Sequence, residues 1–206
     1  PEDYPEKPPW IWVTAGGDVQ KDRLEASSAG WSESGDEESG LVDHLIIQGD
    51  PAMPEVWGKL KDDLVDMGIS MAAIDAGYNT SRVEAFCERK RWAIPVKGVP
   101  GMSRPVIEDE RKRRQRLRVR RKKGMPKEPI GVDGGKALIF ARLKLPAPGP
   151  GYIHFPVHPA FDDEYFAQLA GEKLVTKIKN GRPFQQWIST RPRNEALDCV
   201  LYALAA

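Results

Sequence analysis

Short apolar runs separated by polar turns dominate the first fifty residues of the chain. The runs occupy positions 10–18, 23–31 and 41–48, and the segments between them are polar, with glycine in the longer one. This pattern predicts three strands joined by turns. Because consecutive strands with short connections usually pair with one another, we expect an antiparallel meander.

Helical spacing follows the meander. Pro54 stands near the start of a stretch whose apolar residues recur about once per helical turn, and Gly68 is expected to end it. Those apolar residues are Val56, Leu60, Leu64 and Met67. The pattern then predicts a strand at 69–75, a helix at 79–89 and a strand at 92–97. Because strand, helix and strand in this order form a βαβ unit, we expect parallel pairing there.

The second half of the chain continues to alternate helical and strand patterns. The predicted elements are a helix after Asp133, a strand at 152–155, a short helix at 161–169, a hairpin of 174–178 with 184–188 around Asn180 and Gly181, and a last helix from about Asn194. Such an order predicts an α/β fold with a mixed central sheet flanked by helices.

The predicted order of strands and helices places three aspartates where their side chains can lie close together. Asp18 ends the first strand, Asp75 ends the strand at 69–75, and Asp198 lies in the last helix. Adjacent strand ends and a crossing helix would bring the three carboxylates together. Phosphodiester hydrolysis by two divalent ions needs such converging oxygen ligands around ions about 3.5–4 Å apart. We therefore predict a nuclease site in which these aspartates are catalytic and hold two Mg²⁺ or Mn²⁺ ions.

Each aspartate also has a simpler interpretation. Asp18 fits a turn at a strand end, Asp75 fits a helix cap before Asn79, and Asp198 fits a surface position on the last helix. The neighbours of Asp198 argue against the last interpretation, because nearly all are apolar: Ala196, Leu197, Cys199, Val200 and Leu201. An acid in so apolar a helix is costly unless it is paired or binds metal. The whole arrangement is similar to that of ribonuclease H-like nucleases of the resolvase and integrase type.

Length and composition are typical of a globular protein. The chain has 206 residues, 40% hydrophobic and 30% charged, which suits one domain with a full core. Its apolar runs fall far short of the roughly 20 residues of a membrane helix, so we expect a soluble, cytoplasmic protein. Residues 1–9 are proline-rich like an interdomain linker, which predicts a fragment whose domain covers residues 10–206. Cys87 and Cys199 lie among apolar neighbours and are expected in the core.

The net charge of +1 conceals a concentrated basic run. It lies in an excursion at about 101–130, predicted to be flexible, and consists of Arg111, Lys112, Arg113, Arg114, Arg116, Arg118, Arg120, Arg121, Lys122 and Lys123. Charges at this density repel one another unless counterions or phosphates neutralise them, which favours binding to the backbone of double-stranded DNA. A solvated loop is the alternative. Leu117 and Val119 would allow part of the run to form an edge hairpin.

Other polar residues are weaker candidates. His154 is a candidate accessory residue of the site, although a histidine on a short strand is more often packed or hydrogen-bonded. Lys97, Arg191 and Arg193 are candidates for contacts with DNA phosphates. Glu195 is expected to support the first turn of the last helix. The six tryptophans fit core packing better than base stacking.

Six segments, in order and over nearly the whole chain, resemble the nuclease half of a lambda-type large terminase subunit from a tailed phage. They are Ala15–Glu25, Gly49–Pro51, Ile74–Thr80, Val96–Gly98, Gly151–Pro156 and Arg193–Leu204. The resemblance implies a subunit that joins a packaging ATPase to a nuclease, which cuts concatemeric viral DNA during head filling. It also implies that the small terminase subunit and the portal are partners, and that the protein acts in the host cytoplasm.

The resemblance implies that the family's metal-binding acids correspond to Asp18, Asp75 and Asp198. We expect Asp18 to bridge the two ions and Asp75 and Asp198 each to complete the shell of one ion. Many terminase nucleases have Glu where Asp75 stands. A phosphate-cradling loop is absent, because the segment Gly131–Lys136 has the wrong spacing and lacks the hydroxyl that binds magnesium, so ATP hydrolysis is not expected. Two alternatives stay open: a junction resolvase on the same fold, and a DNA-clamping module of the packaging motor that binds metal only structurally. The basic run would grip DNA or contact a motor partner.

Overall fold

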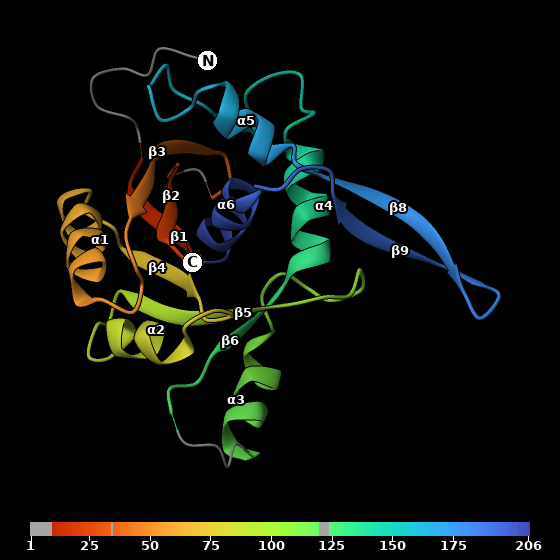
Figure 1. Ribbon diagram of the computed structural model, residues 1–206. Coiled ribbons are helices and arrows are strands. Elements are labelled where there is room, and N and C mark those ends of the chain that lie inside the picture. Colours follow the sequence, from red (N-terminus) through yellow and green to blue (C-terminus); the bar gives the residue numbers. More distant parts are fainter. Residues whose placement is uncertain (1–9, 34, 120–123) are drawn as a thin grey trace.

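The computed structural model describes residues 10–33, 35–119 and 124–206 (Figure 1). The predicted linker at residues 1–9 lies outside the described residues, as do Arg120, Arg121, Lys122 and Lys123 of the basic run.

A seven-stranded mixed sheet forms the centre of the described chain, in the order β6-β5-β4-β1-β2-β3-β7. Its strands are β1 (Trp12–Val19), β2 (Arg23–Trp31), β3 (Ser39–Gln48), β4 (Met71–Asp75), β5 (Ala93–Val99), β6 (Glu128–Gly131) and β7 (Ile153–His154). β1, β2 and β3 pair antiparallel, whereas β1, β4, β5 and β6 run parallel. The predicted meander, the βαβ unit and the ribonuclease H-like class of fold are confirmed.

Helices cover both faces of this sheet (Figure 1). The described helices are α1 (Pro54–Asp66), α2 (Thr80–Cys87), α3 (Glu110–Val119), α4 (Val132–Arg142), α5 (Asp163–Leu169) and α6 (Glu195–Ala205), and all except α3 cover the sheet (Figure 1). On one face, α1 and α2 bury Trp57, Leu60 and Phe86. On the other, α4, α5 and α6 bury an apolar set that includes Ile139 and Leu201. No helix in the described ranges is long and apolar enough to cross a membrane.

α6 approaches β1 so closely that only glycine fits between them. A Cβ atom on Gly16 would lie 2.0 Å from the carbonyl oxygen of Cys199 and 2.2 Å from the amide nitrogen of Ala203. Thr14 Oγ1 donates a 2.7 Å hydrogen bond to the Ala203 carbonyl oxygen, which fixes the same contact. The helix that carries Asp198 therefore lies with its backbone directly against the strand that carries Asp18.

The hairpin and both cysteines agree with the sequence. β8 (Glu172–Lys179) and β9 (Arg182–Ser189) pair as a separate two-stranded sheet that projects from the domain (Figure 1). Their turn residues Asn180 and Gly181 have φ angles of 51° and 73°, the positive values that a two-residue hairpin turn needs. Cys87 and Cys199 are free, buried thiols.

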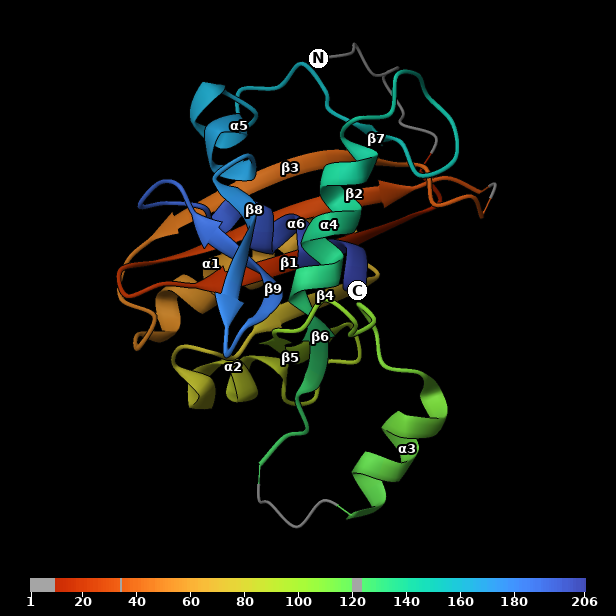
Figure 2. The ribbon, with the colours of Figure 1, turned by 90° about the vertical axis from the view of Figure 1, so that its right-hand side faces the viewer.

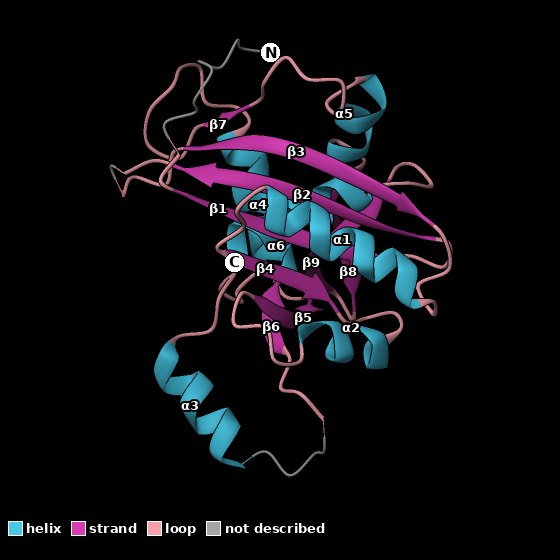
Figure 3. Ribbon diagram, turned by 90° about the vertical axis from the view of Figure 1, so that its left-hand side faces the viewer, coloured by secondary structure: helices cyan, strands magenta, loops and turns pink. Residues whose placement is uncertain are grey.

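Three expectations need correction. The segment with Leu117 and Val119 is not an edge hairpin but α3, which stands away from the sheet beyond β6 (Figures 2 and 3). Arginine, lysine and glutamine favour a helix, and the Glu110–Arg114 pair has helical i,i+4 spacing. The sequence pattern also missed β6, a strand of only four residues. Trp12 is not a core residue, because it is 54% exposed.

The contact at Gly16 gives a first prediction. Gly16→Ala inserts a methyl group against backbone atoms that cannot turn aside, so we expect a loss of about 3 kcal/mol or more in the free energy of unfolding. Gly58→Ala is the matched control, because Gly58 is helical and a Cβ there has no neighbour within 4 Å. It should stabilise the protein by about 0.5–1 kcal/mol. Denaturant unfolding measures both changes, and equal effects would contradict the close contact.

Candidate metal centre

The fold brings the three predicted aspartates to one edge of the sheet. Asp18 is the next-to-last residue of β1 and Asp75 is the last residue of β4. The parallel register pairs Gly17 with Ile74, so the two aspartates follow as neighbours. Asp198 belongs to the first turns of α6, whose backbone packs on β1 at Gly16.

Asp18 is the most perturbed acid of the three. Its Oδ1 accepts a 3.0 Å hydrogen bond from the Val19 amide, and its Oδ2 accepts a 2.6 Å bond from Gln20 Nε2. Burial raises the pKa of Asp18 from 3.8 to about 7, and the charges of Asp198 and Asp75 add to the rise. The Gln20 bond acts in the opposite direction but does not offset these effects.

Asp75 and Asp198 have raised pKa values for the same reasons. Burial is the main cause for each. The charge of Asp198 raises the pKa of Asp75 further, although the amide of Gly77 donates a 3.1 Å hydrogen bond to Asp75 Oδ2. The charges of Asp75 and Asp198 thus act on Asp18, and the charge of Asp198 acts on Asp75. Glu172 and Glu195 are the acids that raise the pKa of Asp198.

Lys136 is a residue of this site that sequence reasoning missed. Its Nζ lies 2.9 Å from Asp198 Oδ1 and 2.7 Å from Glu172 Oε1. Burial would lower the pKa of this ammonium, but Asp198 and Glu172 raise it, so Lys136 stays charged. The segment Gly131–Lys136 gives no functional motif, because its spacing is wrong for a phosphate loop. A lysine inside an otherwise apolar helical pattern was the available signal.

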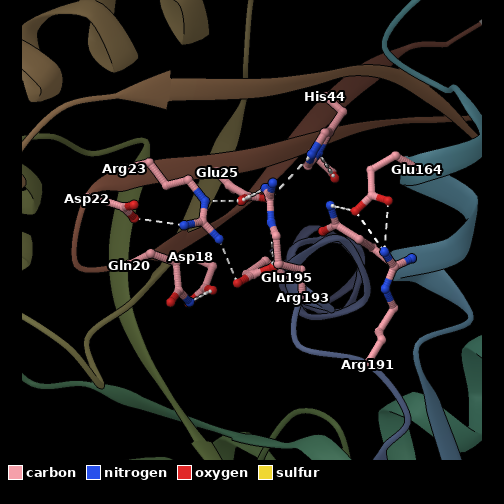
Figure 4. A network of polar contacts seen from close by, with 12 residues as sticks. Asp18, Gln20, Asp22, Arg23, Glu25, His44, Glu164, Arg191, Arg193 and Glu195 are labelled. Atoms are coloured by element: carbon pink, nitrogen blue, oxygen red, sulfur yellow. Dashed lines mark hydrogen bonds and ion pairs between the residues drawn. The ribbon is translucent and has the colours of Figure 1, made fainter.

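A second set of charges lies beside Asp18, on β2, on α6 and on the segment just before α6 (Figure 4). Arg23 Nη2 is 2.8 Å from Glu195 Oε1, and Arg193 Nη2 is 2.7 Å from Glu25 Oε1. Although burial opposes it, contacts with His44, Arg23 and Arg193 lower the pKa of Glu25 to about 2. Glu195 therefore does more than support the first turn of α6, because it is buried and ion-paired with Arg23.

The three aspartates are the right type of ligand for a divalent cation, but their side chains are not arranged around one position. In the described part of the chain, no three His, Cys, Asp or Glu side chains are arranged to hold a metal ion as they stand. Asp18 is turned to Gln20 and Asp198 to Lys136. Carboxylate oxygens are the ligands that Mg²⁺ and Mn²⁺ prefer. The raised pKa values come first from burial and then from neighbouring negative charge, and a divalent ion would relieve both. The residues present fit a divalent ion.

His154 lies far from the three acids. The strand register sets it level with Gly40 on β3 and, through β2, with Val13 at the start of β1. Five residues of strand, about 17 Å, separate Val13 from Asp18 along β1. His154 Nε2 is 2.7 Å from Glu38 Oε1, as expected for a packed, hydrogen-bonded histidine.

The candidate DNA-binding residues fall into two regions. Lys97 is exposed on β5, one residue beyond the register partner of Asp75, and Arg193 pairs with Glu25 near the site. The described basic run lies on α3, where several charges are already paired: Arg113 with Glu128, Arg114 with Glu110, and Arg116 with Glu108 and Glu128. Arg111 and Arg118 are exposed and make no ion pair within the described ranges.

The sequence matches a known family over almost its entire length. Residues 5–206 match the family described as terminase large subunit gpA, endonuclease domain. The chain belongs to this family. It is 35% identical over 214 residues to the large terminase subunit of Escherichia phage lambda and 31% identical to that of Enterobacteria phage P21. Each alignment covers 95% of this chain but 32% of the relative, so the chain spans about a third of the relatives' length.

Solved terminase nuclease domains share the fold. The nuclease domain of gp2 from bacterial virus Sf6, in a mutant form with manganese, aligns with a TM-score of 0.55 at 15% identity, covering 97% of this chain and 90% of that one. The nuclease from thermophilic phage G20c gives 0.54 at 12% identity, covering 99% and 85%. The nuclease domain of bacteriophage SPP1 with bound Mn gives 0.50 at 11% identity, covering 95% and 86%.

The raised pKa of Asp18 predicts that this residue lowers the free energy of unfolding by an amount that depends on pH. Below about pH 4 the carboxyl is protonated whether the chain is folded or not, and no cost exists. As the pH rises from about 4 to 7, the unfolded chain releases the proton and the folded chain retains it, so stability falls. In chelator at about pH 8, Asp18→Asn should raise the free energy of unfolding by about 2–4 kcal/mol. Denaturant unfolding of Asp18→Asn and the wild type at about pH 8 and about pH 4 measures this difference, which should vanish near pH 4. An equal gain in stability at the two pH values would contradict a raised pKa for Asp18.

Proposed function

We propose that this chain is a divalent-metal-dependent endonuclease that hydrolyses phosphodiester bonds of concatemeric double-stranded viral DNA. The observation that carries the proposal is the convergence of three aspartates from β1, β4 and α6, each with a pKa raised by burial and by its acidic neighbours. Membership of the terminase endonuclease family supports it. Relatives that contain manganese support the choice of Mg²⁺ or Mn²⁺.

The aspartates have distinct positions toward such ions. When bound, two divalent ions would supply an activated water and stabilise the leaving oxygen. Asp18 interacts with the charges of both other aspartates, so it is the residue suited to bridge two ions. Asp75 on β4 and Asp198 on α6 would then each hold one ion. Arg23 pairs with Glu195 and Arg193 pairs with Glu25, which partly compensates the negative charge of these two acids beside the site.

No protein nucleophile is required for this reaction. The two thiols of the chain are buried, and burial raises the pKa of Cys87 to about 12 and that of Cys199 well above its usual value. A thiol in that state is not a nucleophile at neutral pH. Attack by water fits the donor set better than a covalent intermediate.

The duplex is expected to lie on the basic surfaces near and beyond the site. Lys97 is the exposed cation on the strand next to Asp75, and the exposed arginines of α3 offer a second contact with phosphates. Such contacts position DNA through its backbone without reading its sequence. The packaging ATPase of the same subunit, the small terminase subunit and the portal are the proposed partners, with the host cytoplasm as the place of action.

Plasmid cleavage tests this function directly. With Mg²⁺ or Mn²⁺ the purified protein should nick and linearise supercoiled plasmid, and chelator should stop the reaction. Asp18→Ala, Asp75→Ala and Asp198→Ala should each lower the rate at least about 100-fold, because each removes an oxygen ligand. Asp62→Ala, an exposed acid on α1, is the matched control and should cleave normally. A folded wild type that binds plasmid but never cuts with either metal would favour the DNA-clamping module instead.

The basic helix gives a separate prediction. Replacing Arg111 and Arg118 by alanine removes two exposed cations, so affinity for duplex DNA should fall and the slope of log K against log salt should decrease by about 1–2. The double variant Lys59→Ala and Lys61→Ala loses the same charge from α1 and is the control. Fluorescence anisotropy across a salt series measures both slopes. Equal changes in the two double variants would show that α3 is not a specific contact.

A further inference from the structure

We propose that Lys136 is a resident counter-cation of the metal centre, a positioning residue that neutralises Asp198 without metal and withdraws to Glu172 when metal binds. The inference rests on the metal centre of the proposed function. It assigns a role to a residue outside the three aspartates. Whether Asp198 is free to bind metal then depends on the position of the Lys136 ammonium.

The contacts of Lys136 suit an exchange between two partners. Its Nζ is 2.9 Å from Asp198 Oδ1 and 2.7 Å from Glu172 Oε1, so the ammonium already touches both acids. The side chain of Lys136 is only 10% exposed and that of Glu172 only 8%, whereas that of Asp198 is 28% exposed. Asp198 is therefore the partner open to an incoming ion, and Glu172 is the partner closed to it.

Close packing between α4 and α6 brings Lys136 within contact distance of Asp198. A Cβ on Gly135 would lie 2.2 Å from Leu201 Cδ1, so α4 packs closely against α6 at this glycine, and a larger residue would displace the Leu201 side chain. The next residue along α4 is Lys136, and Asp198 is one turn before Leu201 on α6. The close packing at Gly135 thus places the neighbouring Lys136 against Asp198.

Glu172 is held ready as the second partner. Asn194 Nδ2, at the start of α6, donates a hydrogen bond to Glu172 Oε1. Glu172 is the first residue of β8 and sits at the base of the hairpin. Because Glu172 is fixed from two sides, Lys136 can leave Asp198 without becoming an unpaired buried charge, which would be costly.

Competition between cations is the physical consequence. A divalent ion on Asp198 and the ammonium of Lys136 share one carboxylate and repel each other at a separation of about 5 Å. Removing the ammonium leaves the site more negative and frees an oxygen of Asp198. The affinity of the DNA-free protein for a divalent ion should then rise, even though a cation that pairs with the aspartate has been lost.

Titration calorimetry with Mn²⁺ and no DNA tests the proposal. Lys136→Met keeps the length of the side chain and removes its charge, so the dissociation constant for Mn²⁺ should fall at least about tenfold. Lys173→Met is the matched control, because Lys173 is exposed next to Glu172 and should leave the constant unchanged. Lys136→Arg retains the charge and should behave like the wild type.

A second variant changes the affinity in the opposite direction. Glu172→Gln removes the alternate partner and ties Lys136 more tightly to Asp198, so Mn²⁺ binding should weaken several-fold. In the Lys136→Met background the same substitution should have little effect, because it acts through the lysine. This cycle also covers the case in which Lys136→Met alone folds poorly, since Glu172→Gln can then be measured by itself.

The outcomes separate this inference from the function on which it rests. Unchanged or weaker Mn²⁺ binding by a folded Lys136→Met protein would overturn the role of Lys136, as would tighter binding by Glu172→Gln. A folded wild type that binds no Mn²⁺ would instead contradict the metal centre itself. If Lys136 were only structural, its loss would lower the melting temperature equally with and without Mn²⁺, whereas competition predicts a larger gain from Mn²⁺ in the variant.

Discussion

The backbone contact between α6 and β1 is the constraint on which the rest of the site depends. Gly16 has no side chain, so Cys199 and Ala203 of α6 can lie against the strand. This contact carries Asp198 to the edge where β1 and β4 end with Asp18 and Asp75. A helix held farther away would leave two acids on neighbouring strands and no third ligand to complete a site.

Bringing the three aspartates together in a buried place lowers the stability of the fold, and the neighbouring cations only partly offset this loss. Burial first, and then the charges of neighbouring acids, raise the pKa of all three aspartates, which means that folding alone disfavours their charged forms. The neighbouring acids fare differently, because Arg23 and Arg193 pair with Glu195 and Glu25. The raised pKa values of the aspartates are a cost in stability of the kind that functional sites commonly carry.

Local patterns sufficed to predict the elements that carry the acids. Apolar runs ending in Asp18 and Asp75 and an apolar helix containing Asp198 each have a strong periodicity, and the Asn180-Gly181 turn has a specific backbone requirement. Lys136 could not be assigned in this way, because its partners Asp198 and Glu172 lie on α6 and on the hairpin, which meet α4 only in the fold. α3 and the four-residue β6 were missed because a charged run has no apolar period and a short strand gives too few residues to detect one.

The central claim is that Asp18, Asp75 and Asp198 hold divalent ions at the edge of the sheet. A crystal structure of the domain grown with Mn²⁺, with anomalous scattering measured at the manganese edge, tests it most directly. The account predicts two peaks about 3.5–4 Å apart, with Asp18 between them and carboxylate oxygens at about 2.0–2.3 Å from the ions. Well-ordered aspartates with no anomalous peak beside them, or peaks only at other surface acids, would contradict it.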